Sequence, residues 1–467
     1  MSPSQPTQRE FLKLAIPNII TNLSVPMAGL IDVAILGHLN DINPLAGVAL
    51  AGLLFDFAYW GFAFLRMSTT GLTAKAFGAG KARESAAVFF RAFALALLAG
   101  AFLILIQKPY AYLGFQLLEG EPAVEAAGKA YFYARIWGAP ATMGGYVVVG
   151  WLLGRQRATD ALIFALVLNG TNVFLDWLFI YQFGMGAQGA GLATMLAELA
   201  SFLVGLFLVW RAWRDLPGFS FDYFRDKATF IQLLVLNGNI MIRTLCLIGT
   251  FAVFTNFSAL MGSVLLAANT ILLRLLNTAA YFIDGFAYAL ESLAGKYAGA
   301  EQWLRVRRSL TLALAWNLFS VLIFLGIFFL FRAEIFGLLT SHQPVIQEGV
   351  RYFPWVSGIL ILSGFAYIFD GFFIGLADGT RLRNSMLWAT LVGFVPLAWI
   401  SRELQAPHLL WFSMFLFMGI RSVTLGWSGF GLLRNHLLSG QTEVILPESG
   451  IGSLAKDIAF ENLKKHD

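Results

Sequence analysis

Charged residues are scarce in this sequence. Asp, Glu, Lys and Arg make up 13% of the 467 residues, whereas soluble domains carry roughly 25%. Hydrophobic residues reach 58%, and the mean hydropathy is +0.71. This composition excludes an ordinary soluble domain with a polar surface, so we expect a lipid bilayer to surround most of the chain.

Cysteine and histidine are scarce as well. The one cysteine, Cys246, lies in an apolar stretch, which excludes a disulfide framework and a cysteine metal site. The five histidines show no paired spacing, and neither H-E-x-x-H nor G-x-S-x-G occurs. We therefore expect no enzymatic activity and no cofactor. Residues 1–10 are polar and lead directly into an apolar segment, so we expect no cleavable signal peptide.

Long apolar runs fill most of the remaining chain, and they approach the ~20 residues that cross a bilayer as a helix. We expect an all-α polytopic membrane protein with twelve transmembrane helices. The expected spans are residues 11–38, 45–73, 86–107, 124–153, 160–181, 188–210, 229–261, 264–294, 309–331, 345–376, 384–401 and 408–433.

The sequence repeats itself once, at a constant offset. Lys75 recurs as Lys296, and Gly78 recurs at the same distance as Gly299. A repeat without a shift indicates two similar lobes of six helices each. Because six is even, both lobes begin and end on the same side, and a pseudo-twofold axis along the membrane normal relates them. Substrates of such proteins cross at the seam between the lobes.

Basic residues mark one side of the membrane. If the amino terminus is inside, the inner loops are rich in Lys and Arg and the outer loops are poor in them, which predicts that both termini are cytoplasmic. The spread of basic residues over many loops explains the net charge of +5 without a nucleic-acid partner. We expect an amino-terminal lobe at 1–211, a cytoplasmic linker at 212–228, a carboxy-terminal lobe at 229–436 and a mobile cytoplasmic tail at 437–467.

Polar residues inside the amino-terminal spans form a candidate cation site. Asn169, Asn172 and Asp176 follow i, i+3, i+7 spacing and therefore share one helix stripe. Asp32, Asp176 and Thr194 each lie roughly 8–10 Å below the outer edge of their spans. The carboxylates of Asp32 and Asp176, with the oxygens of Asn172 and Thr194, could bind Na⁺ or share a proton.

Other intramembrane residues leave alternatives open. Asn169 suits an interhelical hydrogen bond better than a substrate contact. Pro17 and Pro26 remove backbone hydrogen bonds from the first span, which allows a static kink or a moving part. In the second half, Asp284 and Asp370 are candidates for structural ion pairs with Arg243 or Arg274, or for an inner gate, and direct substrate contact is the alternative.

Five segments carry a resemblance to a known family. They are IPNIITNLSVPMAGLIDVAILGHL (16–39), LTAKAFGAGK (72–81), NGTNVFLDWLFIY (169–181), GAGLAT (189–194) and AYIFDGFFIGLADG (366–379). Their order and spacing resemble those of the multidrug and toxic compound extrusion (MATE) transporters, and within that family the DinF-type branch. The resemblance extends along the chain to about residue 435.

This resemblance implies the twelve-helix, two-lobe MATE fold and cation-driven export of amphipathic, often cationic compounds by alternating access. It implies that the cation site of the amino-terminal lobe is Asp32, Asn172, Asp176 and Thr194, and that the bend in the first helix falls most naturally on Pro17. The location implied is the cytoplasmic membrane, and we expect a monomer that acts on small molecules.

Two questions stay open at this point. Another branch of the family uses a glutamate in the seventh span for Na⁺, but this chain has Arg243 in that span and Asp370 alone does not restore the site. Both H⁺ and Na⁺ suit the amino-terminal cluster. The alternative function is a flippase of related fold for lipid-linked oligosaccharides, which would be expected to line its cavity with more basic residues.

Overall fold

The computed structural model describes residues 7–39, 41–118, 120–214 and 216–445. Every regular element in these ranges is a helix, and twelve helical spans are long and apolar enough to cross a membrane. The predicted fold class and the twelve predicted spans are therefore confirmed. Among the membrane spans themselves, the largest difference in a boundary is at the ninth span, which begins at Trp303 rather than at 309.

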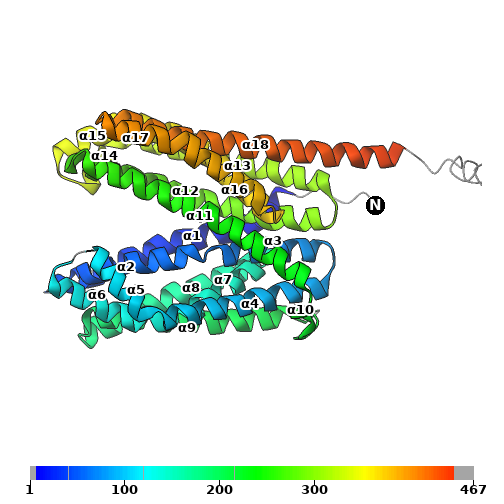
Figure 1. Cartoon of the computed structure of the whole chain (residues 1–467), viewed down its shortest axis with the longest axis horizontal. Helices are drawn as coiled ribbons and strands as arrows, with labels where there is room; N and C mark the ends of the chain where they lie inside the picture. The colour runs from blue at the N-terminus through cyan, green and yellow to red at the C-terminus, as the bar shows by residue number, and fades with distance from the viewer. Residues whose placement is uncertain (1–6, 40, 119, 215, 446–467) are drawn as a thin grey trace, which may run out of the picture.

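The first half of the chain forms one lobe and the second half forms the other, and the two lie one above the other in Figure 1. The helices of the first half are α1 (Gln8–Gly37), α2 (Asn43–Gly61), α3 (Phe64–Gly78), α4 (Ala82–Leu105), α5 (Gln107–Leu118), α6 (Pro122–Arg135), η1 (Ile136–Gly138), α7 (Ala139–Gly154), α8 (Ala158–Asp176), η2 (Trp177–Gln182) and α9 (Gly186–Ala212). The short helix α10 (Asp222–Arg225) lies between the two halves in sequence and packs against α4, where Nε of Arg91 donates to the carbonyl oxygen of Tyr223. The helices of the second half are α11 (Lys227–Leu260), α12 (Ser263–Gly299), α13 (Trp303–Leu330), α14 (Arg332–Leu339), α15 (Gln343–Gly375), α16 (Gly379–Trp388), η3 (Ala389–Phe394), α17 (Val395–Glu403) and α18 (Pro407–Ile445).

The sequence repeat is a repeat of helix packing. A Cβ on Gly150 of α7 would lie 2.5 Å from the carbonyl oxygen of Arg66 in α3, and a Cβ on Gly371 of α15 would lie 2.5 Å from the carbonyl oxygen of Ala287 in α12. The second pair is the repeat equivalent of the first, at the offset that also separates the two halves of the sequence. One turn further, the same contact recurs between Gly154 and Thr70 and between Gly375 and Glu291. Small residues at these positions let the backbones approach closely, as in other membrane helix pairs.

The two lobes touch through their backbones where α3 and α12 cross. A Cβ on Gly78 would lie 1.8 Å from the carbonyl oxygen of Lys296, and a Cβ on Gly299 would lie 2.1 Å from that of Lys75. The contact is reciprocal, as expected beside a pseudo-twofold axis. It closes the seam at the end of the molecule that carries both chain termini (Figure 1).

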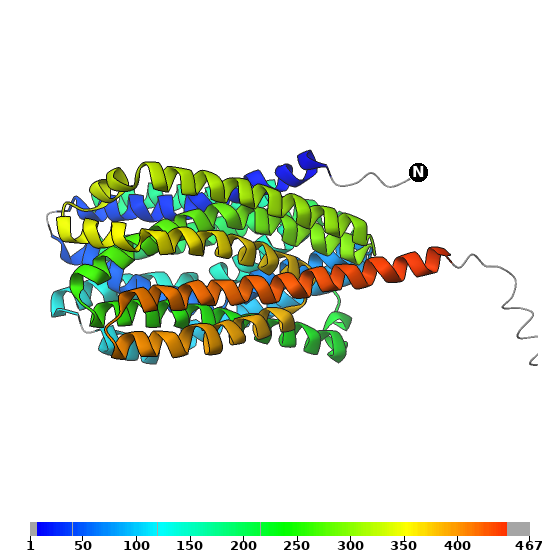
Figure 2. The same ribbon diagram turned by 90° about the horizontal axis from the view of Figure 1, so that it is seen from above.

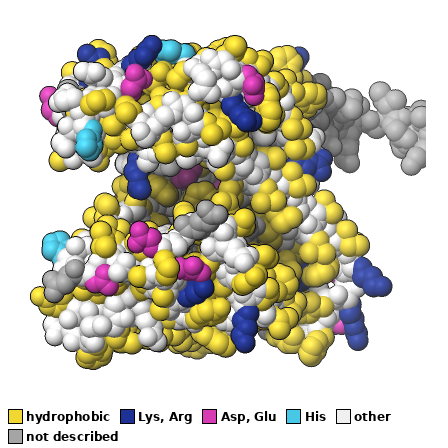
Figure 3. Space-filling model, turned by 60° about the vertical axis from the view of Figure 1, so that its left-hand side comes forward, with side chains coloured by type: hydrophobic (Ala, Val, Ile, Leu, Met, Phe, Trp, Pro, Cys, Tyr) yellow, Lys and Arg dark blue, Asp and Glu magenta, His cyan; other side chains and the backbone are white. Residues whose placement is uncertain are grey.

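The opposite end of the seam is open. Figure 3 shows a deep cleft between the lobes at the end away from the termini, with acidic side chains at its rim and in its depth. One helix also extends further than predicted. The predicted tail begins at 437, but α18 continues to Ile445 and projects beyond the other helices in Figure 2. The remainder of the predicted tail, 446–467, lies outside the described residues.

Candidate functional site

The structure brings the four predicted cation-site residues together in the amino-terminal lobe. The Nδ2 atom of Asn172 donates hydrogen bonds to Oδ2 of Asp176 at 2.9 Å and to Oγ1 of Thr194 at 3.4 Å. The carboxyl groups of Asp32 and Asp176 lie close enough together to interact electrostatically. The cluster therefore joins α1, α8 and α9.

Local helix geometry positions these groups. Asp176 is the last residue of α8, and the span continues directly as the π-helix η2. Such π segments inside membrane helices commonly occur at functional sites. The hydroxyl of Thr194 donates to the carbonyl oxygen of Ala190 at 2.9 Å, which leaves its lone pairs for Asn172. Asp176 is buried and Asp32 is half-buried.

Two carboxylate oxygens of this cluster have no hydrogen-bond donor. Among the described residues, Oδ1 of Asp32 and Oδ1 of Asp176 are buried without a partner. A buried acceptor left unpaired costs free energy, and two adjacent carboxylates cannot both remain charged cheaply. These oxygen ligands, from two carboxylates, one carboxamide and one hydroxyl, fit a proton or a monovalent cation. No group of three or more His, Cys, Asp and Glu that could hold a metal occurs within the described ranges.

Asn169 and the two prolines have structural surroundings. The Nδ2 atom of Asn169 donates to Oγ of Ser24 at 2.7 Å, which ties α8 to α1 as the interhelical interpretation requires. α1 is continuous through Pro17 and Pro26. Between these prolines, Nδ2 of Asn22 donates to the carbonyl oxygen of Tyr281 in α12 at 3.2 Å. α1 is therefore bonded to both lobes.

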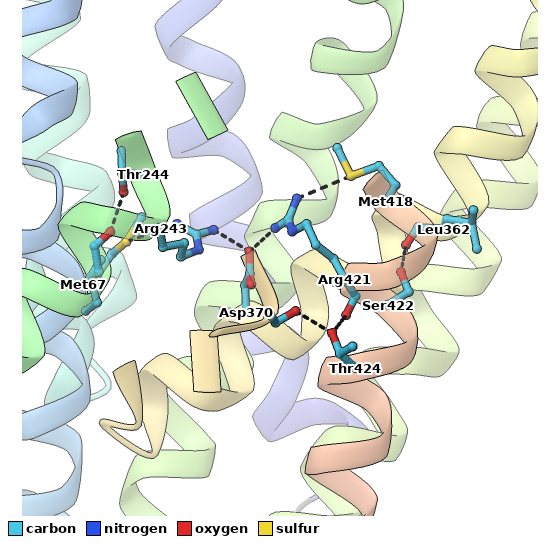
Figure 4. Close-up of polar contacts among 11 residues, drawn as sticks. Met67, Arg243, Thr244, Leu362, Asp370, Met418, Arg421, Ser422 and Thr424 are labelled. Carbon is cyan, nitrogen blue, oxygen red and sulfur yellow. Dashed lines mark hydrogen bonds and ion pairs between the residues drawn. The ribbon is translucent and has the colours of Figure 1, made fainter. Parts of the chain in front are cut away.

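Asp370 forms ion pairs with two arginines in the carboxy-terminal lobe (Figure 4). Its Oδ2 atom accepts from Nη2 of Arg243 and, at 2.6 Å, from Nη2 of Arg421. All three side chains are buried. The predicted pairing of Asp370 with Arg243 is present, whereas the predicted alternative partner Arg274 is exposed and forms no ion pair among the described residues. Two arginines therefore balance the charge of Asp370.

Asp284 forms no ion pair or hydrogen bond within the described ranges, but it lies in the electrostatic field of Arg66 and Arg243. Glu291, two turns further along α12, forms an ion pair with Arg66 of α3, with 3.5 Å between Oε2 and Nη1. The guanidinium of Arg66 also lies 4.2 Å from the ring centroid of Tyr288. An ion pair therefore crosses the seam between the lobes.

Sequence reasoning missed the partners of several charged groups. Arg421 was not considered, and no partner was assigned to Arg66. The buried pair between Arg135 and Glu198 also went unnoticed, although both are ionisable residues in the middle of apolar spans. That property is the signal that could have marked Arg135, Glu198 and Arg421 as candidates.

Comparison with known proteins finds similarity along most of the chain. A family model described as MatE matches residues 17–178 and 240–400, one segment in each half of the repeat. DNA damage-inducible protein F of Escherichia coli (strain K12) is 35% identical over 429 residues, which cover 91% of this chain and 92% of that protein. A probable multidrug resistance protein NorM of Synechococcus is 27% identical over 82% of this chain and 85% of its own length.

Solved structures share the fold. The outward-facing conformation of a multidrug resistance MATE family transporter of the MOP superfamily superimposes with a TM-score of 0.84 at 20% identity, covering 93% of this chain and 97% of that one. A MATE structure in the bent conformation gives a TM-score of 0.81 at 20% identity, covering 92% and 96%. At this level of identity the likeness establishes the architecture alone.

Proposed function

This chain belongs to the MatE family of membrane transporters, and we propose that it exports amphipathic, often cationic compounds in exchange for H⁺ or Na⁺. The observation that carries the proposal is the pair of acidic side chains from α1 and α8, Asp32 and Asp176, each with a buried oxygen that has no partner among the described residues. A cation that enters this cluster relieves the repulsion between the two carboxylates.

The seam supports transport by alternating access. The lobes are parted at one end and meet at the other, where Nζ of Lys296 donates to Oε1 of Gln156 at 2.8 Å and Oη of Tyr297 donates to Oε1 of Glu10 at 2.8 Å. The distribution of Lys and Arg assigns the closed end to the cytoplasm. On this assignment the structure represents a form that is open to the outside.

The first helix can couple the cation to the lobes. α1 carries Asp32, is tied to α8 through Ser24 and is tied to α12 through Asn22. Cation binding at Asp32 therefore acts on a helix that contacts both sides of the seam, and the backbone hydrogen bonds missing at Pro17 and Pro26 give that helix places to adjust. A cation shifts the equilibrium between the two forms only to the extent that it binds them with different affinity.

The flippase alternative is less favoured by the charges near the seam. A carrier of an anionic lipid-linked sugar would need basic side chains free to bind phosphate. The arginines Arg66, Arg243 and Arg421 are instead paired with Glu291 or Asp370, which leaves Arg274 of α12 as an exposed arginine without an ion pair among the described residues.

The experiment is efflux of a fluorescent lipophilic cation from proteoliposomes under an imposed pH or Na⁺ gradient. We expect wild-type protein to respond to at least one gradient and Asp32→Asn and Asp176→Asn to lose that response. Asp222→Asn, at an exposed carboxylate of α10 between the lobes, is the matched control. Gradient-driven efflux by both site variants at the wild-type rate would contradict the coupling role.

We also propose that the protein acts as a monomer in the inner membrane with both termini in the cytoplasm, and that 212–228 links the two lobes on that side. Reporter fusions at the two ends test the orientation, because a fluorescent protein matures inside and alkaline phosphatase is active outside. Activity of alkaline phosphatase at either end would reverse the assignment.

A further inference from the structure

A buried ion pair lies one helical turn beyond the cation cluster. Glu198 follows Thr194 by four residues on α9, a displacement of about 6 Å along the helix axis. The Nη2 atom of Arg135 donates to Oε1 of Glu198 at 3.2 Å, and the two side chains are 18% and 6% exposed. A buried ion pair is weak evidence for stability, because apolar residues of similar size often serve as well. Stability alone therefore does not explain why this ion pair lies beside the cluster, and a functional role is the alternative explanation.

Neighbouring polar side chains lie between this pair and the cluster. The Nη1 atom of Arg135 donates to Oη of Tyr131 at 2.8 Å. Tyr131 is in turn a close neighbour of Thr194. Thr194 accepts from Asn172, which also donates to Asp176. A row of neighbouring polar side chains therefore leads from the guanidinium to the acidic side chains.

The position of Arg135 is set by its surroundings. The guanidinium carbon lies 4.4 Å from the ring centroid of Phe55. α6 ends at Arg135 itself, and the span resumes as α7 only after the short helix η1. Gly138 ends η1, where a Cβ would lie 2.2 Å from Oε2 of Glu198. The absence of a side chain at Gly138 thus makes room for the carboxylate that holds Arg135.

The electrostatic consequence follows from the signs of the charges. Arg135 attracts the carboxylate of Asp32, and the same positive charge repels any cation that approaches that carboxylate. Glu198 partly cancels this repulsion. The charged and titratable groups that share the field of Arg135 are Asp32, Asp56, Tyr59, Tyr131, Tyr146 and Glu198.

We propose that Arg135, held by Glu198, is a positioning residue that sets how tightly Asp32 and Asp176 hold the coupling cation. The inference rests on the proposed function. A fixed positive charge near the cluster weakens cation binding enough for release on the far side of the membrane. The carboxylate of Glu198 keeps that charge in place and limits its strength.

The test is the external H⁺ or Na⁺ concentration that gives half-maximal efflux in proteoliposomes. We expect Glu198→Gln to raise this concentration about tenfold, because it leaves the charge of Arg135 uncompensated in a poorly screened environment. Adding Arg135→Gln to Glu198→Gln should return the value close to that of wild type. Adding Arg135→Lys instead should preserve the rise, since lysine keeps the charge.

The comparison of the single and double variants distinguishes an electrostatic effect from a packing defect. A packing defect worsens when a second contact is removed, whereas the charge model predicts recovery in the double variant. Equal values for wild type and Glu198→Gln, or further weakening in the Glu198→Gln/Arg135→Gln variant, would overturn the inference. If Glu198→Gln does not fold, the single variant Arg135→Gln tests the inference. We expect it to lower the half-maximal concentration severalfold, and an unchanged value would contradict the inference.

The outcome is distinguishable from failure of the proposed function. If the wild type shows no cation-driven efflux, or if Asp32→Asn and Asp176→Asn retain it, the proposed function fails. If those variants lose it while changes at Arg135 and Glu198 leave the half-maximal concentration unaltered, only the present inference fails.

Discussion

We expect Gly78→Ala to force the lobes apart at the closed end and to slow transport. A Cβ at position 78 would lie 1.8 Å from the carbonyl oxygen of Lys296, whereas real Cβ atoms essentially never approach another heavy atom within 3.0 Å, so α3 and α12 must separate locally. The obstacle is backbone and cannot rotate away as the end of a side chain can. Overpacking of this kind costs about 1–3 kcal/mol. Because only the closed arrangement suffers it, that arrangement should lose about five- to 150-fold in relative population.

The assay is a distance measurement across the closed end. Spin labels on Lys81→Cys and Arg308→Cys, exposed positions on different lobes, report the separation in a Cys246→Ala background that has no other thiol. We expect the distance distribution to shift toward longer values in Gly78→Ala. Efflux in proteoliposomes should slow in parallel, because each cycle must pass through the closed arrangement.

Two further glycines provide the controls. Gly299→Ala is expected to reproduce the effect, since its Cβ would meet the carbonyl oxygen of Lys75 at 2.1 Å. Gly52→Ala is the matched helical control, because no atom lies within 4 Å of its added Cβ. Identical distance distributions and rates for Gly78→Ala and Gly52→Ala would refute the reasoning.

Three other outcomes are expected. Asp370→Asn leaves two buried arginines without a carboxylate and should reduce stability by about 3–5 kcal/mol, seen as a lower unfolding temperature in detergent. Asn169→Ala removes the bond to Ser24 and should cost about 1 kcal/mol while cation-driven efflux persists; loss of coupling would instead place Asn169 in the cation site. Hydrogen bonds from Thr229 hold the pKa of the exposed Asp226 carboxyl below its ordinary value. Its contribution to stability is therefore present above the ordinary pKa and lost as the pH falls through the lowered pKa, and Asp226→Asn should abolish that acid-side dependence of the unfolding temperature.

Part of the candidate site was accessible from spacing alone. Asn172 and Asp176 share a helix stripe, and counting residues from the span ends places Asp32 and Thr194 at the same depth. The depth of a residue in the membrane restricts it to a thin layer, so the few polar side chains that share one layer are expected to lie near one another. Their role in coupling stays a prediction.

The partners of the arginines were not accessible in this way. Arg135 and Glu198 are 63 residues apart, and Arg66 and Glu291 belong to different lobes. Nothing in the local pattern of either residue specifies the other. Which arginine faces which carboxylate depends on how each helix is rotated against its neighbours, and that rotation is set by packing along the whole helix.

The order of residues by itself determined the number of spans, the two-lobe repeat and the layer in which the acidic side chains lie. Hydrophobic run length, a fixed offset and helical rise suffice for these, because each is a property of a single segment or of the chain's own periodicity. Only the tertiary structure decided which end of the seam is closed and which charges neutralise one another. Those features are contacts between segments far apart in the chain, and they depend on helix rotations and on the meeting of the two lobes at Gly78 and Gly299.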